Sequence, residues 1–233
     1  MMAMGAIGKY FDARLTRGDG SISAVKPYAD APRLPDGERI DLASLVRGAW
    51  IEIELGPGRG GFIVDRALVE PTAAMLGFEV RRKWASIVDA RLAKMGLASR
   101  ARVLAEDARV ALVRLAPNAS VQRVFSHFPD PWWKKRHQKR LMFAPALLEE
   151  IARLLEPGGE LFLQTDVEER AVQYERMLAD DPRFVAHGDA LGSARLVDNP
   201  YGARSPREKR AMADGLPIFR IRYARVASVT MRA

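Results

Sequence analysis

From residue 50 onward, apolar side chains follow two alternating periods along the chain. Residues 50–55 (WIEIEL) are apolar at every second position, which is typical of a strand, and residues 61–69 (GFIVDRALV) follow a helical period. By the same criteria we predict strands at 73–80, 101–108, 120–128, 160–166 and 217–226, and helices at 84–96, 144–159 and 167–181. This alternation predicts a doubly wound α/β fold with a mostly parallel sheet.

The first 40 residues lack this pattern and are rich in glycine, proline and charge. We interpret residues 1–40 as an N-terminal arm, extended or partly disordered, that either packs on the body or frays. Residues 41–233 then form one domain, a size that a single α/β core can reach.

Composition narrows the class of protein. Hydrophobic residues make up 48%, and Lys plus Arg outnumber Asp plus Glu by 37 to 29, giving a net charge of +8. This excess of basic residues weakly favours a nucleic-acid partner. The alternatives are an acidic membrane surface as partner, or charge that only keeps the protein soluble. With no cysteine and three histidines, we expect neither disulfides nor a metal site. No membrane span or signal peptide is predicted, so we expect a cytoplasmic protein with no obligate protein partner.

The stretch ELGPGRGG follows the first predicted strand and opens a helix. Gly56, Gly58 and Gly61 fit the dinucleotide pattern G-x-G-x-x-G, while Glu54 with the glycines up to Gly60 fits E-x-G-x-G-x-G. A dinucleotide would place its pyrophosphate at the helix N-terminus. S-adenosylmethionine has no phosphate, and its cationic amino-acid end would favour an acid at Glu54.

Two more acids follow the next two strands. Glu79 ends the second strand, where it could accept from both ribose hydroxyls, and Asp107 follows the third, where it could accept from an adenine amino group. NAD would share the ribose acid, and either residue alone could be a surface acid. The three acids together favour an adenosyl ligand at the carboxyl edge of the sheet.

The segment HFPDPWWKKRHQKR combines a rigid acid with aromatic and basic residues. Prolines on both sides restrict Asp130 to few conformations, which suits a ligand-orienting group. Trp132 and Trp133 could stack on a base or pack inside the protein. The five cations that follow could contact phosphates or form a solvated face. Their position beside the rigid acid favours nucleic acid.

These motifs resemble a known family, the bacterial tRNA (guanine-N7)-methyltransferases. The resemblance spans about residues 50–223 and is carried by E-L-G-P-G-R-G, F-E-V, E-D-A, F-P-D-P-W with K-K-R-H-Q-K-R, and Q-T-D, in that order. It implies a Rossmann-like class I methyltransferase fold with an antiparallel C-terminal strand. It also implies S-adenosyl-L-methionine as cofactor, tRNA as partner, and 7-methylguanosine at position 46 of the variable loop as product.

The resemblance also assigns roles to residues. The cofactor-binding residues are Glu54, Gly56, Gly58, Glu79, Asp107 and Asp130, and Asp130 is also the catalytic residue. The substrate-binding residues are Lys134, Arg136, His137, Lys139, Arg140 and Asp166. A family element T-x-x-E that binds guanine appears here as S-P-R-E. Ser205 and Glu208 in it either bind guanine, or cap a helix ending near Gly215, or do both.

Guanine N7 carries a free lone pair, so its methylation requires no general base. We therefore expect Asp130, Asp166 and Glu208 to accept from the donor edge of guanine and to stabilise the developing positive charge. Two rivals stay open: a methyltransferase acting on a small molecule or protein, and an inactive RNA-binding relative. An NAD-dependent dehydrogenase is disfavoured because no hydride-chemistry pair of His with an acid or Arg is evident.

Overall fold

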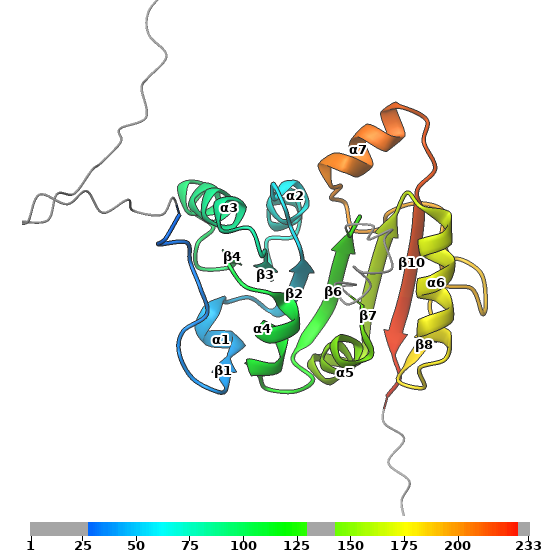
Figure 1. Cartoon of the computed structure of the whole chain (residues 1–233), viewed down its shortest axis with the longest axis horizontal. Helices are drawn as coiled ribbons and strands as arrows, with labels where there is room; N and C mark the ends of the chain where they lie inside the picture. Colours follow the sequence, from blue (N-terminus) through cyan, green and yellow to red (C-terminus); the bar gives the residue numbers. More distant parts are fainter. Residues whose placement is uncertain (1–27, 130–142, 228–233) are drawn as a thin grey trace, which may run out of the picture.

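The computed structural model describes residues 28–129 and 143–227 of the chain (Figure 1). The strands are β1 (Ile40–Asp41), β2 (Trp50–Leu55), β3 (Ala73–Phe78), β4 (Ala101–Leu104), β5 (Leu115–Ala116), β6 (Val121–His127), β7 (Leu155–Thr165), β8 (Phe184–Ala186), β9 (Arg195–Leu196) and β10 (Phe219–Arg225). The helices are α1 (Leu42–Leu45), α2 (Gly61–Val69), α3 (Arg82–Lys94), α4 (Ala108–Arg114), α5 (Pro145–Leu154), α6 (Glu168–Ala179) and α7 (Pro206–Ala213).

The main sheet is mostly parallel, as the sequence pattern predicted. Its strand order is β4-β3-β2-β6-β7-β10-β8, with β9 pairing to β10 off this path. Strands β4, β3, β2, β6 and β7 pair in parallel, whereas β10 is antiparallel to β7 and β8. The chain order reverses between β2 and β6, and ligands of such sheets bind at the carboxyl ends of the strands near this point.

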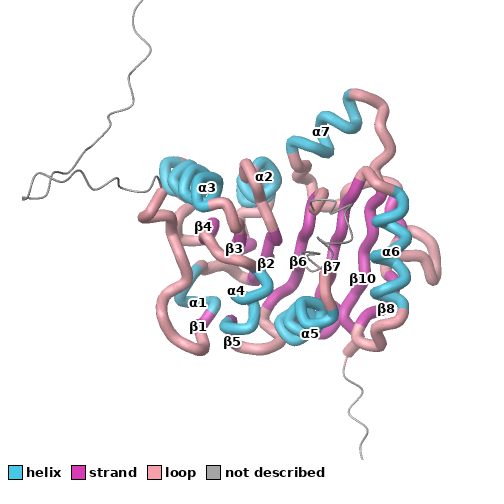
Figure 2. The backbone as a smooth tube through the Cα atoms, in the orientation of Figure 1, coloured by secondary structure: helices cyan, strands magenta, loops and turns pink. Residues whose placement is uncertain are grey.

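Helices cover both faces of the sheet (Figure 2). On one face Phe62 of α2 and Val88 of α3 belong to a buried cluster that includes Phe125 of β6. On the other face α4, α5 and α6 bury Leu112, Leu148 and other apolar side chains in a second cluster. The predicted doubly wound α/β fold is therefore confirmed. Within residues 28–129 and 143–227, no helix is long and apolar enough to cross a membrane.

The described part of the N-terminal arm packs on the body. Ala31 and Leu34 are buried, and Ala105 N donates a 2.6 Å hydrogen bond to Pro32 O. Arg33 pairs with Glu106 at 3.2 Å. Of the two alternatives for the arm, packing holds for residues 28–40, whereas residues 1–27 lie outside the described part. The division into arm and domain at residue 40 stays a prediction.

Two predicted elements have different bounds in the structure. The strand predicted at 101–108 ends at Leu104, because Asp107 caps a helix that the sequence pattern did not predict, α4. The helix predicted at 144–159 ends at Leu154, and β7 already begins at Leu155. The Pro-Gly-Gly segment therefore lies inside β7. At Gly159 a Cβ would meet Gln122 O at 3.0 Å, so glycine permits close approach to the neighbouring strand.

Candidate cofactor and substrate site

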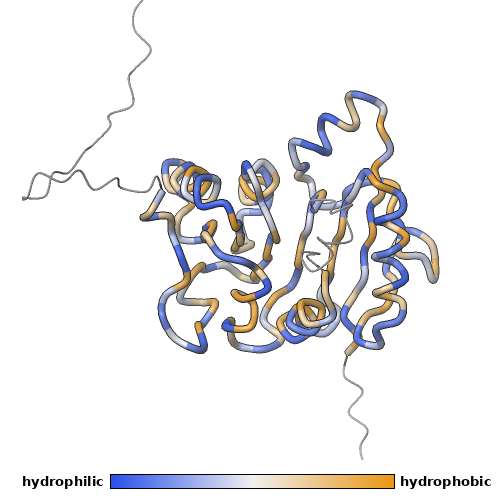
Figure 3. The backbone as a smooth tube through the Cα atoms, viewed as in Figure 1, coloured by the Kyte–Doolittle hydropathy of each residue, from blue (hydrophilic) through white to orange (hydrophobic). Residues whose placement is uncertain are grey.

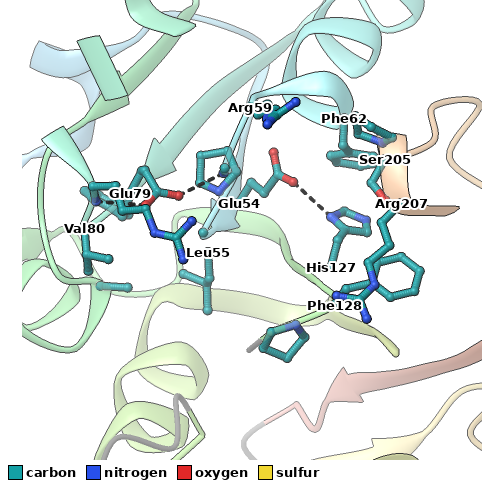
Figure 4. Close-up of a pocket in the computed structure, with 18 of the residues that line it drawn as sticks. Glu54, Leu55, Arg59, Phe62, Glu79, Val80, His127, Phe128, Ser205 and Arg207 are labelled. Carbon is teal, nitrogen blue, oxygen red and sulfur yellow. Dashed lines mark hydrogen bonds and ion pairs between the residues drawn. The ribbon is translucent and has the colours of Figure 1, made fainter. Parts of the chain in front are cut away.

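A cavity of about 500 Å³ lies beyond the carboxyl ends of β2, β3, β4 and β6, beside the start of α7 (Figure 4). Its walls are residues 54–59, 78–81, 107–109, 127–129 and 205–207, together with Phe62. The glycine turn, Glu79 and Asp107 thus line one cavity, although they come from three different strand ends. The volume is in the range of pockets that hold small molecules.

The glycine turn adopts a backbone that L side chains rarely take. Gly56 and Gly58 have φ of 72° and 54°, so both positions favour glycine. Gly56 N donates to Phe78 O at 2.9 Å, which ties the turn to the end of β3. The backbone of the turn therefore lies at the cavity wall, as the motif predicted. The contacts of Gly56 and Gly58 with the cofactor stay predictions.

Glu79 is buried and holds the turn in place. Its Oε2 accepts from Gly58 N at 2.9 Å and its Oε1 accepts from Arg81 N at 2.8 Å. A carboxylate oxygen has two acceptor sites, so each oxygen retains one for a ligand. The carboxylate is thus oriented for the predicted contacts with two ribose hydroxyls, which stay a prediction.

Asp107 is the N-cap of α4 and accepts from Arg109 N at 3.0 Å. The Arg109 side chain also donates to it, with Nε 3.0 Å from Oδ1. This hydrogen bond holds the pKa of the Asp107 carboxyl below its usual range, against an opposing effect of partial burial. Asp107 is therefore an anion at neutral pH, able to accept from an amino group.

Glu54 contacts a residue that the sequence reasoning did not assign to the site, His127. The Nδ1 of His127 lies 3.0 Å from Glu54 Oε1, and the two side chains are 3% and 2% exposed (Figure 4). Neither Glu54 Oε2 nor His127 Nε2 has a hydrogen-bond partner among the described residues. The sequence held one signal: His127 is two residues after Phe125 on β6, so it faces the same side.

These residues fit S-adenosylmethionine. Glu54 offers a buried oxygen without a partner to an ammonium group, while Glu79 and Asp107 offer oriented carboxylates to hydroxyl and amino groups. The acids belong to neighbouring strand ends in the order β2, β3, β4. The predicted acceptors for the amino-acid end, the ribose and the adenine therefore follow one another along the cavity.

Asp166, a predicted substrate contact, lies just after β7. Arg207 of α7 holds it in a two-pronged ion pair, with Nη2 2.7 Å and Nε 3.1 Å from Oδ2. The Arg207 guanidinium also lies 5.3 Å from the centre of the Phe128 ring, and both of these residues line the cavity. Asp166 is thus brought next to the cavity from a distant part of the sequence.

The S-P-R-E element caps α7 as predicted, but only the Ser205 half of a capping box is formed, because the Glu208 carboxylate binds other residues. Ser205 Oγ accepts from Glu208 N at 3.1 Å at the start of α7, and Pro206 occupies the first turn. Glu208 is fully buried, accepts from Arg220 Nη2 at 2.9 Å and Asn199 Nδ2 at 3.0 Å, and does not line the cavity. Ser205 does line it. The guanine contacts of Ser205 and Glu208 stay predictions.

Six predicted site residues lie outside the described part of the chain: Asp130, Lys134, Arg136, His137, Lys139 and Arg140. The preceding residue, Pro129, lines the cavity. Chain connectivity alone therefore brings Asp130 to within one residue of the cavity wall.

Several known proteins are similar in sequence to this chain. A family model described as "Putative methyltransferase" matches residues 49–221. A tRNA (guanine-N7)-methyltransferase of Myxococcus xanthus is 35% identical over 76% of this chain and 84% of its own length. One of Anaeromyxobacter dehalogenans is 37% identical over 76% and 87%.

Among solved structures, the 16S rRNA methyltransferase KamB has the same fold, with a TM-score of 0.56 at 14% identity, over 80% of this chain and 91% of its own. Sequence identity at this level over three quarters of the chain, together with the match to the family model, shows the family. The chain belongs to the tRNA (guanine-N7)-methyltransferase family.

Proposed function

We propose that this protein transfers a methyl group from S-adenosylmethionine to guanine N7 in the variable loop of tRNA. Relatives 31–37% identical bear the name of this activity. The observation that carries the proposal is the cavity, where acids from three adjacent strand ends meet the glycine turn. The net charge of +8 supports a polyanionic partner.

The cavity residues would hold the cofactor along its length. Glu54 would accept from the amino group, Glu79 from the ribose and Asp107 from the adenine. Gly56 and Gly58, without side chains, would let the ligand approach the backbone. Bound there, S-adenosylmethionine supplies an electrophilic methyl group. The contribution of the protein is to orient it and exclude water.

On the substrate side, the acids would act on the guanine base without removing a proton. N7 is an acceptor with a free lone pair, so a carboxylate serves better at the donor edge of the base. Asp130 and Asp166 would accept there and stabilise the positive charge that develops on the purine. Arg207 now binds Asp166, so guanine would share this carboxylate or displace Arg207.

Incubation with S-adenosylmethionine and unmodified tRNA, followed by nucleoside mass spectrometry, tests the proposal. We expect 7-methylguanosine, and digestion into fragments should place it in the variable loop. A different methylated nucleoside would contradict the target, and no methylation would contradict the activity.

Asp130→Ala tests the catalytic role within the same assay. We expect turnover to collapse while the affinity for S-adenosylhomocysteine falls much less, because the acid would act mainly on the base. Asp130→Asn, which keeps size and polarity but loses the charge, separates orientation from charge stabilisation. Near-normal turnover in Asp130→Ala would refute the role.

A further inference from the structure

The Glu54–His127 pair has two further polar atoms, and both residues line one end of the cavity. A carboxylate only accepts, so the 3.0 Å contact makes His127 Nδ1 the donor to Glu54 Oε1. The second oxygen of Glu54 and the second nitrogen of His127 have no partner among the described residues. Leaving such buried groups unsatisfied is costly, and a ligand that satisfies both would relieve that cost.

Apolar rings hold the imidazole of His127 in place. Its centre lies 4.0 Å from that of Phe62, 6.0 Å from Phe125 and 5.8 Å from Phe162. These rings restrict rotation of the imidazole and exclude water from its edge. The second nitrogen therefore has a fixed direction, which suits the recognition of one specific ligand group.

Three arginines among the described cavity residues have other contacts. Arg109 binds Asp107, Arg207 binds Asp166, and the Arg59 guanidinium lies 5.0 Å from the centre of the Trp84 ring. Two strands, β3 and β2, separate Asp107 at the end of β4 from His127 at the end of β6. His127 is the described cavity residue that contacts Glu54 directly and has a second ring nitrogen without a described partner.

We propose that His127 is a cofactor-binding residue that recognises the carboxylate of the amino-acid end of S-adenosylmethionine. The inference rests on the proposed function, because it takes that cofactor as the ligand. An amino acid carries an ammonium and a carboxylate on one carbon. Glu54 Oε2 can accept from the ammonium, and His127 Nε2, when it carries a hydrogen, can donate to the carboxylate. In the complex His127 Nδ1–H donates to Glu54 and Nε2–H donates to the ligand carboxylate.

Three ligands of graded length test this role by calorimetry: S-adenosylhomocysteine, its decarboxylated analogue, which keeps the amine, and methylthioadenosine, which lacks the whole amino-acid end. His127→Asn retains a donor near the Nδ1 position but has no counterpart of Nε2. We expect this variant to bind S-adenosylhomocysteine about tenfold or more weakly, which is the scale of a lost hydrogen bond to a charged group. The affinities for the two smaller ligands should change by less than about twofold.

Asp107→Asn is the matched control, because it alters an acid at the opposite, adenine end of the cavity. It should lower the affinity for all three ligands by one common factor. Three results with His127→Asn would overturn the assignment: an equal loss of affinity for all three ligands, a loss of affinity shared by the decarboxylated analogue, or no loss of affinity for any ligand. No loss would mean that backbone N–H groups at the start of α2 hold the carboxylate. If the unchanged protein bound none of the three ligands, the cofactor assignment itself would fail.

Nitrogen NMR of the unaltered protein provides a test that needs no variant. With ¹⁵N-labelled histidine, the His127 ring should show both nitrogens protonated in the S-adenosylhomocysteine complex at neutral pH, and one in the methylthioadenosine complex. A neutral ring with a free lone pair at Nε2 in the first complex would overturn the proposal.

Discussion

Among single residues, Asp107 has an electrostatic state that its neighbour sets. The Arg109 side chain lowers the pKa of Asp107 by hydrogen bonding, so Arg109→Gln should raise that pKa toward its ordinary value of about 3.9. The stabilising effect of the pair is present above the unfolded pKa and is lost as pH falls through the folded one. The variant should therefore lose stability at neutral pH, by less than about 1 kcal/mol for this partly exposed pair, and none at strongly acidic pH.

A ¹³C NMR titration of the Asp107 carboxyl, with denaturant unfolding at several pH values, measures both effects. Arg183→Gln is the control, because it removes a similar pair with Asp181 and should leave the Asp107 titration unchanged. An Asp107 pKa that did not rise in Arg109→Gln would show that capping of α4, not Arg109, sets it.

Glu52 and Glu54 show what neighbours add to a sequence pattern. The strand period places both acids on one face of β2, but Glu52 binds Arg66 and Arg123 at 2.8 Å each, whereas Glu54 faces the cavity. Glu52→Ala should cost about 3–5 kcal/mol of unfolding free energy, because two arginines lose a buried partner. Glu54→Ala should cost less, because Glu54 has a single described side-chain partner, His127, but it should abolish most cofactor affinity.

Urea unfolding and calorimetry with S-adenosylhomocysteine separate these two effects. A larger stability loss in Glu54→Ala than in Glu52→Ala would contradict the assignment of roles. Glu54 was predicted from the glycine motif. The role of Glu52 was not, because Arg66 and Arg123 lie 14 and 71 residues away and only the fold brings them together.

For whole elements, the junction of α2 with α7 controls one wall of the cavity. A Cβ at Gly61 would lie 2.4 Å from the Pro206 ring, so Gly61→Ala must push the start of α7 away. We expect a loss of about 1–3 kcal/mol in unfolding free energy and weaker binding of S-adenosylhomocysteine. Pro206→Ala removes the ring atoms in the way, so the double variant should recover most of both losses.

A double-mutant cycle by thermal and urea unfolding measures this coupling. Pro206→Ala alone is the control and should be nearly neutral, because alanine also suits the first turn of a helix. Additive losses in the double variant would mean that Gly61 matters for reasons other than its contact with α7.

Long, regularly patterned elements were predictable, and short or polar ones were not. Strands β2, β6 and β10 and helices α2 and α6 follow their hydrophobic period, and β3 is a continuous apolar run. Helix α4 has seven residues, and β8 and β9 have three and two, too short to show a period. Helix α7 is coloured mainly as hydrophilic in Figure 3, and only its capping box revealed it. Its buried Glu208 depends on Arg220, a partner on β10 that no local pattern indicates.

At the scale of the whole molecule, the location of the positive charge should affect tRNA binding more than the total charge does. Lys139 and Arg140 lie outside the described residues, and in the sequence they follow Pro129, which lines the cavity. If both contact phosphates, Lys139→Gln with Arg140→Gln should weaken tRNA binding and make the slope of log affinity against log salt shallower by about 1.5–2. Filter binding or anisotropy across a range of salt concentrations measures that slope.

The matched control removes the same charge from the opposite edge of the sheet. Arg39 and Arg47 are exposed and precede β1 and β2, so they lie away from the strand ends that line the cavity. Arg39→Gln with Arg47→Gln also changes the net charge from +8 to +6, since two of the cations are removed. The slope should stay close to that of the unaltered protein, because counterions are released only where phosphates are contacted. Equal changes in the two double variants would instead mean that tRNA responds to the overall charge, and that the basic segment after Asp130 is an ordinary solvated surface.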